Sequence, residues 1–155
     1  MSFSGFSDQI DKVKTIPNIP FWPDLNISQF QADYRLPGEY RESMLEDRLK
    51  LAMIWANTQL EGWKKEQVTD GVVSLGEVPV GESPAWGSPL VLLYIRAVSC
   101  HAKALLLEDY ATVMRKSDAV SDAKESEDTV EKWHRMAANA LNDLQSKPKI
   151  HAELL

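Results

Sequence analysis

The sequence has little cysteine, no excess of basic charge, and no apolar run close to the roughly 18 residues that a membrane span needs. Its single Cys100 cannot form an internal disulfide, which suits a reducing cytosol. The segment from Met1 to Phe6 lacks both the basic start and the long apolar stretch of a secretory signal. These absences exclude a disulfide-stapled domain, and we expect no contact with a membrane.

Charge sets a second limit on function. The formal net charge is -6 and the pI is near 5.1. Binding by neutralisation of phosphates needs clustered Lys and Arg, so tight capture of nucleic acid is not expected. An acidic protein could still surround DNA without holding it. With 155 residues, 44% of them apolar, the chain fits one soluble globular domain with a single core.

The sequence also lacks the motifs of common enzymes: a phosphate loop, a dinucleotide fingerprint, a nucleophile elbow and a paired Cys-x-x-Cys. Glu131 and His134 have the E-x-x-H spacing of di-metal helical bundles. Such a site needs a second pair, and Val98 stands where His101 would need its Glu. Cys100 and His101 are adjacent on a helix and point about 100 degrees apart, which does not suit a nucleophile and its base. We expect no enzyme, metal or cofactor; a metal-dependent helical enzyme is the alternative to test.

What the sequence does contain is strong helical periodicity. Ser43 with Glu46 forms a capping-box pattern that opens about five amphipathic turns, and Ser88 followed by Pro89 starts a helix that is apolar nearly all round. A further helix precedes Lys147-Pro148, after a polar connection over 115–128. The expected core includes Leu49, Ala52, Ala56, Leu60, Leu93, Ala97, Trp133, Ala137 and Leu141.

These patterns predict a mainly α fold, a small helical bundle with two or three long helices. A flexible, extended N-terminal arm is expected over residues 1–20, the helical domain over 21–146, and an extended C-terminal tail over 147–155. A capping-box pattern at Ser28 and Gln31 indicates a short helix near the start of the domain. The long loop over 68–87 could include a short β-ribbon.

Three apolar pieces have no obvious burial site in this scheme. Phe21 and Trp22 lie between two prolines, Trp86 lies in the long loop, and Leu154 and Leu155 lie in the tail. Contiguous exposed apolar surface normally marks contact with a partner. The alternative is that all three pieces fold back on the domain.

Several stretches, taken in order, carry a resemblance to a known family. They are "FWPDLNISQFQADYRLPGEY", "LGEVP", "YIRAVSCHAKA" and the closing "KPKIHAELL". In this order and spacing the chain, from about Phe21 to Leu155, resembles the head completion proteins (GPL) of tailed bacteriophages with contractile tails. The first twenty residues depart from the family pattern.

The resemblance implies a structural virion protein, made in the host cytoplasm, that joins the capsid vertex after genome packaging. It implies a homo-oligomeric ring of twelvefold symmetry under the portal protein, which offers a platform to a neck or tail completion protein. Genomic double-stranded DNA would pass through the channel without sequence-specific binding. The alternative from another class is a monomeric helical adaptor that binds one cytosolic protein.

The resemblance also suggests which residues make these contacts. A neighbouring subunit would bury Phe21, Trp22 and Pro23, and Trp86 would lie at the same interface or face the channel or the next neck protein. The tail is expected to dock on the portal through Ile150, His151, Ala152, Glu153, Leu154 and Leu155.

Overall fold

The computed structural model describes the backbone of residues 14–36, 38, 40–114 and 120–146, and the side chains of these residues except 110–114 and 120–128. The elements, in chain order, are β1 (Thr15–Ile16), β2 (Leu25–Asn26), α2 (Ile27–Asp33), α3 (Glu42–Gln59), α4 (Glu61–Thr69), the short 3-10 helix η1 (Leu75–Glu77), α5 (Pro89–Met114) and α6 (Val120–Leu144). The predicted mainly α fold is confirmed.

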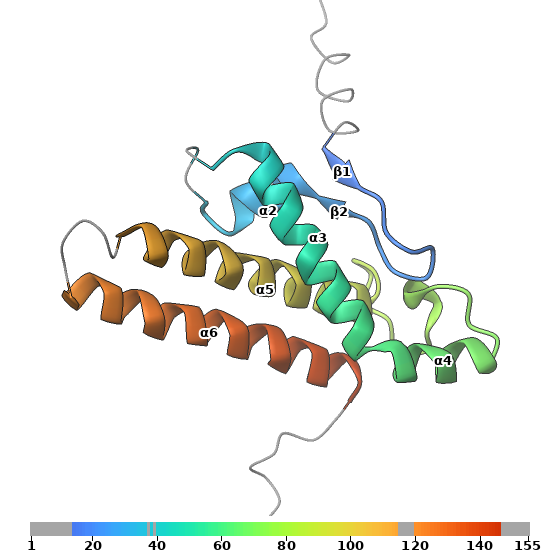
Figure 1. Cartoon of the computed structure of the whole chain (residues 1–155). Coiled ribbons are helices and arrows are strands. Elements are labelled where there is room, and N and C mark those ends of the chain that lie inside the picture. The colour runs from blue at the N-terminus through green and yellow to red at the C-terminus, as the bar shows by residue number, and fades with distance from the viewer. Residues whose placement is uncertain (1–13, 37, 39, 115–119, 147–155) are drawn as a thin grey trace, which may run out of the picture.

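Helix α5 lies at the centre of the fold. Helix α6 runs along it, and α3 crosses it (Figure 1). The contact between α5 and α6 is the most extensive in the fold. On α5, Ala97, Ala102 and Ala104 are fully buried, and such small side chains let neighbouring helices approach closely. The nearly continuous apolar character of this helix follows from its having partners on more than one side.

The predicted core is largely confirmed. Seven of its residues are buried, namely Leu49, Ala52, Ala56, Leu60, Ala97, Ala137 and Leu141. Leu93 packs against the core but is only half-buried. Trp133 is also half-buried, with its ring against Tyr34 at 5.8 Å between ring centroids. Both therefore lie at the edge of the core rather than inside it.

The expectation that no stretch of the chain is long and apolar enough to span a membrane is wrong for α5. Among the described residues, the stretch Pro89–Asp109 is long and apolar enough to span a bilayer, with a mean hydropathy of 1.7. Half of that stretch is buried inside the fold. The core helix of a soluble protein passes the same test of length and composition. Contacts with α3 and α6 bury part of the apolar surface of this stretch, while Leu92 is 55% exposed.

Two helix starts differ from the predicted ones. The N-cap of α2 is Asn26, not Ser28, because the Asn26 side chain accepts a hydrogen bond from the Gln29 amide at 2.9 Å. Helix α3 begins at Glu42, and its N-cap Arg41 has no side-chain capping bond, so the predicted Ser43 capping box is not used. Helix α5 does begin at Pro89 as predicted, and Ser88 Oγ accepts from the Leu90 amide at 3.2 Å.

The single amphipathic helix of about five turns predicted after Ser43 is two helices in the structure. The backbone departs from helical geometry at Leu60 (φ -96°, ψ 3°), and α4 then leads away from the body of the molecule (Figure 1). Leu60 itself is fully buried, so it anchors the corner in the core. The apolar period continues across this corner, which explains why the sequence pattern does not reveal it.

The β-ribbon predicted within the 68–87 loop is absent, and a two-strand pair forms near the start of the domain instead. Strands β1 and β2 pair antiparallel, with Thr15 opposite Asn26 and Ile16 opposite Leu25. Within the 68–87 loop the structure has η1 and no strand. Residues 14–20, assigned above to a flexible arm, therefore belong to the fold, while 1–13 lie outside the described residues.

The polar connection predicted over 115–128 is shorter than expected. Helix α6 already begins at Val120. Residues 115–119, between α5 and α6, lie outside the described part of the chain.

Candidate interaction surfaces

The aromatic segment Phe21-Trp22 lies inside the chain's own core. The Trp22 ring stacks on Tyr94 of α5, with ring centroids 4.9 Å apart and planes 8° from parallel. The ring centroids of Trp22 and of Trp63 on α4 are 6.4 Å apart, and those of Trp22 and Phe21 are 4.7 Å apart in an edge-on arrangement. The segment thus joins α4 to α5, and this stacking is worth more than the buried area alone.

A network of hydrogen bonds among Asn18, Asn57 and Tyr94, here called the Asn18 network, holds this segment in place. Asn18 Nδ2 donates to the Tyr94 hydroxyl at 2.8 Å and to the Pro23 carbonyl at 2.9 Å. The Tyr94 hydroxyl donates to Asn57 Oδ1 at 2.5 Å, and Asn57 Nδ2 donates to Asn18 Oδ1 at 3.1 Å. Burial raises the pKa of Tyr94 to about 12, so the phenol keeps its proton. Three segments far apart in sequence are therefore tied at one point.

The expectation that a neighbouring subunit buries Phe21 and Trp22 is corrected by this arrangement. Phe21 is 5% exposed and Trp22 is 3% exposed in the single chain. Pro23 is half-buried, and its carbonyl is held by Asn18. No aromatic surface of this pair is left for another subunit, so the fold-back alternative describes them.

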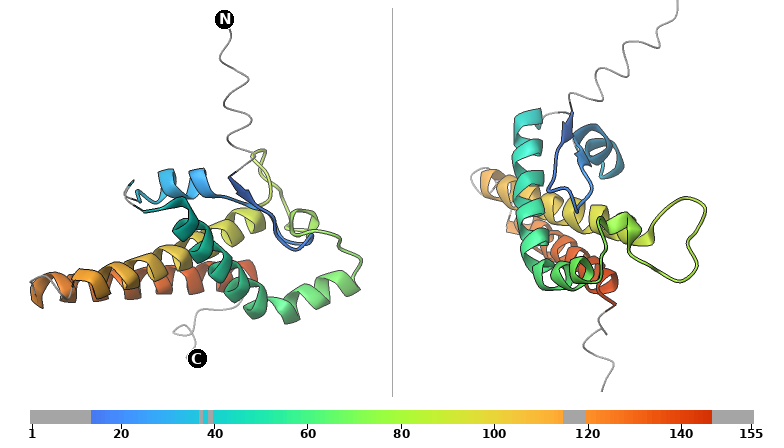
Figure 2. Two further views of the ribbon diagram at one scale, coloured as in Figure 1. Left: turned by 45° about the horizontal axis from the view of Figure 1, so that its top comes forward. Right: turned by 90° about the vertical axis from the view of Figure 1, so that its right-hand side faces the viewer.

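Trp86 behaves in the opposite way. It lies in the chain between η1 and α5, which stands out as a wide loop in the right-hand view of Figure 2, and 64% of its surface is exposed. The Gly87 amide donates to the Pro84 carbonyl at 3.2 Å, and Gly87 has φ +125°, a conformation that favours glycine. This tight turn presents the indole to solvent. Trp86 is therefore available for contact with another protein.

A second exposed apolar surface lies on α3. Leu51 is 46% exposed and Ile54 is 62% exposed, and their spacing of three places them side by side on the helix. We call this pair the α3 ridge. Sequence reasoning overlooked it, although the signal was present, since both residues fall off the buried period of Leu49, Ala52 and Ala56.

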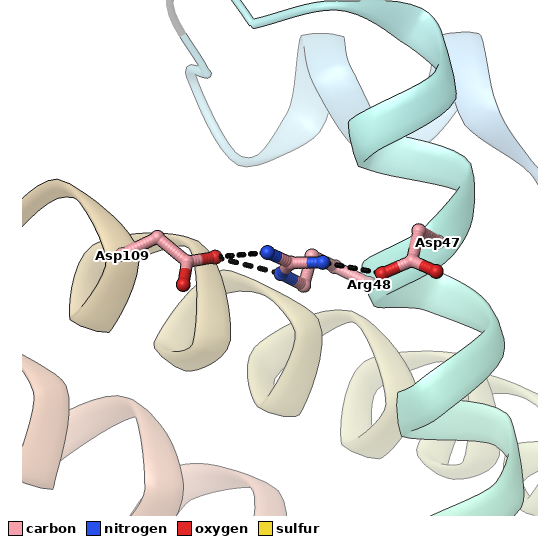
Figure 3. Close-up of polar contacts among 3 residues, drawn as sticks. All are labelled: Asp47, Arg48 and Asp109. Atoms are coloured by element: carbon pink, nitrogen blue, oxygen red, sulfur yellow. Dashed lines mark hydrogen bonds and ion pairs between the residues drawn. The ribbon is translucent and has the colours of Figure 1, made fainter.

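An ion pair fixes α3 against α5 near the start of α3. Arg48 Nε and Nη2 both contact Asp109 Oδ2 of α5, at 2.7 and 2.6 Å, and Arg48 also contacts Asp47 beside it. Figure 3 shows the guanidinium between the two carboxylates. The hydrogen bond to Asp109 is the main reason that the pKa of Arg48 is raised. The ion pair therefore helps to fix the crossing that presents the ridge.

The two candidate histidines, His101 and His134, lie in a row of rings with Trp55. The His101 ring stacks on Trp55 at 4.1 Å and meets His134 edge-on at 5.1 Å, while His134 Nε2 lies 2.8 Å from Glu108 Oε1. Desolvation lowers the pKa of His101 to about 4, helped by the neighbouring His134. Glu131 is exposed on α6. Among the described residues, no group of three or more His, Cys, Asp or Glu could hold a metal ion.

Cys100 does not suit a nucleophilic role. It is buried, and desolvation raises the pKa of its thiol, so the reactive thiolate is disfavoured. It acts as a small core residue between the helices.

A groove of about 730 Å³ lies where α4, the start of α5 and the end of α6 meet. Half-buried apolar side chains such as Trp63, Val72 and Leu93 line it, together with Asp70 and Asp143. Ser146, at the end of α6, also lines it. The predicted docking residues Ile150 to Leu155 follow directly but lie outside the described residues.

Comparison with known proteins identifies the family. The model of the phage head completion protein (GPL) family matches residues 16–155. The chain belongs to this family. The head completion/stabilization protein of Escherichia phage P2 is 26% identical over 134 residues, which cover 86% of this chain and 79% of that protein. No solved structure matches the chain.

Membership of the head completion protein family agrees with the resemblance seen in the sequence, except that the match already begins at residue 16, within the twenty residues expected to depart from the family pattern. It makes the chain a component of a phage virion with a structural role, which must meet other head and tail components. In a head completion protein the exposed Trp86, the α3 ridge and the groove are therefore the candidate functional surfaces. Sequence reasoning found the first of these and missed the other two.

Proposed function

We propose that the chain is a non-enzymatic connector subunit that forms a ring under the portal after DNA packaging. Twelve copies would match the symmetry of the portal, stabilise the filled head and offer a platform to a neck or tail completion protein. The observation that carries this proposal is the family match over residues 16–155, together with exposed apolar surface on a chain whose core is already complete.

Ring formation needs two different patches on each subunit, because a head-to-tail interface joins unlike surfaces. Trp86 and the α3 ridge meet this requirement, since they lie on separate elements and neither is covered in the single chain. Trp86 replaces Phe21 and Trp22 as the aromatic anchor of the interface. Aromatic side chains of this kind often dominate the binding energy between proteins.

Attachment to the portal is assigned to Ile150, His151, Ala152, Glu153, Leu154 and Leu155. Their apolar members suit a hydrophobic cleft on a partner. The net charge of -6 suits a channel through which DNA slides, because carboxylates near the lumen repel phosphates and prevent sticking.

The test is mass measurement by light scattering on the chain mixed with its portal ring, beside the chain alone. We expect a mass increase of about twelve subunits for each portal ring, with loss of that increase when residues 150–155 are deleted and unchanged helical content by circular dichroism. A chain that ignores the portal would contradict the connector role. A one-to-one complex with some other protein would favour the monomeric adaptor.

A further inference from the structure

The groove at the end of α6 is lined by apolar side chains and by two carboxylates. Its apolar walls come from three separate parts of the chain: Trp63 on α4, Val72 and Val80 after α4, and Leu93 on α5. Its charged lining residues are Asp70 and Asp143, with no Lys or Arg among the lining residues. An occupant with apolar side chains and nearby positive charge would complement it on both counts.

The backbone turns at the edge of this groove. The Gln145 amide donates to the Leu141 carbonyl and the Ser146 amide donates to the Asp143 carbonyl, both at 3.1 Å. Ser146 has φ +55°, the left-handed conformation that ends many helices and redirects the chain. Because Ser146 itself lines the groove, the residues that follow begin at the groove's edge.

Residues 147–155, "KPKIHAELL", combine the positive charge and the apolar side chains that would complement the groove. In the sequence, Lys147 and Lys149 come first, and the apolar residues Ile150, Leu154 and Leu155 follow. Pro148 disfavours continuation of the helix. Nine extended residues reach up to about 30 Å, which is ample to cross a groove of this size. A segment tethered at the edge of its site also has an effective concentration in the mM range, which favours binding within the chain.

We propose that, in the free subunit, the groove holds residues 147–155 of the same chain, with Lys147 and Lys149 beside Asp70 and Asp143. The groove shelters the apolar end of the segment from water until another surface takes it over. This inference concerns the subunit before assembly, so it does not rest on the ring or on the portal. It extends to the tail what the structure shows for Phe21 and Trp22, which this chain also buries by itself.

Disulfide trapping in the full chain tests this placement. Leu154→Cys is combined with Val72→Cys or with Val80→Cys in the groove, and with Ile54→Cys on the exposed α3 ridge as the matched control. Cys100 stays in place because it is buried. A disulfide forms readily only when the two Cα atoms come within about 7 Å.

Under mild oxidation we expect a monomeric linked product with at least one groove position, formed at least tenfold faster than with the Ile54→Cys control. Equal rates at the groove and at the ridge would overturn the proposal, as would no linkage at either groove position. Linked dimers alone would show that the groove takes the segment of a second copy, which also overturns it.

Charge provides an independent readout. Asp70→Asn with Asp143→Asn should slow the groove linkage about fivefold at low salt, with little effect in 1 M salt. The matched control is Glu66→Gln with Glu77→Gln, two exposed carboxylates that do not line the groove, and it should leave the rate unchanged. Equal slowing by both double variants would remove the ionic contacts from the proposal.

Failure of this inference and failure of the proposed function give different results. Linkage is measured without the portal, and portal attachment is measured without the added cysteines. A chain that links in the groove but ignores the portal keeps the groove assignment and loses the connector role. A chain that binds the portal but never forms the groove disulfide keeps the connector role and loses the groove assignment.

Discussion

Two proline-framed aromatic segments of this chain have opposite fates. Trp22 lies between Pro20 and Pro23 and is 3% exposed, whereas Trp86 lies between Pro84 and Pro89 and is 64% exposed. The difference is in their partners. Asn18 ties the first segment to α3 and α5, whereas the hydrogen bond from the Gly87 amide to the Pro84 carbonyl stays within the second segment. Burial of an aromatic segment thus depends on partners for its neighbouring backbone and polar groups, as well as on its apolar area.

Trp22 and Trp86 should differ most in their contribution to the stability of the fold. Trp22→Ala should reduce the free energy of unfolding of the isolated chain by about 3–5 kcal/mol, because it leaves a cavity between Phe21, Trp63 and Tyr94. Urea unfolding followed by circular dichroism would measure it. A loss below about 1 kcal/mol would mean that this stack is not part of the core.

Loss of the Asn18 network should cause the next largest decrease in the free energy of unfolding. Asn18→Ala leaves the Asn57 amide without its acceptor and removes the donor to the Pro23 carbonyl, which should cost about 1–3 kcal/mol. Exposed Asn139→Ala on α6 is the matched control and should change stability by less than about 0.5 kcal/mol. If the two variants unfold at the same urea concentration, the Asn18 network does not hold the aromatic segment in place.

Acid should weaken the row of rings beside the α3 ridge. Since the pKa of His101 is lowered to about 4 in the folded chain, the unfolded chain binds a proton between pH 6.5 and pH 4 that the folded chain does not. Stability should therefore fall as the pH drops through that window, by about 1–2 kcal/mol after allowance for partial exposure.

His101→Phe is the control for this pH effect. It keeps a ring against Trp55 and removes the titration, while His134 and Glu108 remain in place. The variant should flatten the decline in unfolding free energy between pH 6.5 and pH 4. An unchanged pH profile would assign the decline to other groups.

The ion pair across the α3–α5 crossing should have the smallest effect on stability. Asp109→Asn should cost about 0.5–1 kcal/mol at low salt and less in 1 M salt, because Asp109 is 40% exposed. Lys50→Gln, which breaks the exposed Lys50–Glu46 pair within α3, should cost less still. A larger loss for Asp109→Asn would show that the ion pair between α3 and α5 contributes more to stability than the pair within α3. The reverse order would contradict this prediction.

The sequence predicted the parts of the fold that depend on local pattern. Ser88 and Pro89 mark the start of α5 because capping chemistry is local, and the period of Leu49, Ala52 and Ala56 marks the buried face of α3. It did not predict the corner at Leu60, where no proline interrupts the period and tertiary contacts set the direction of α4.

The candidate surfaces depended even more on contacts between distant residues. Asn18 and Tyr94 are 76 residues apart, and no pattern near Asn18 indicates that it would bury Trp22. The groove likewise forms from α4, α5 and α6 together. By contrast, the exposure of Leu51 and Ile54 follows from the helical period alone and could have been read from the sequence.

Trp22 stabilises the fold, and we propose that Trp86 serves assembly. Attachment to the portal is assigned to residues 150–155, but subunits that lose a contact with their neighbours should also load the portal ring more weakly. The affinity of Trp86→Ala for the portal ring would be measured by light scattering, beside the urea unfolding curve of the variant. We predict unfolding within about 0.5 kcal/mol of the native chain and affinity at least tenfold weaker, as expected for loss of an aromatic anchor worth about 2 kcal/mol. Unchanged affinity, or a stability loss as large as that of Trp22→Ala, would contradict the claim.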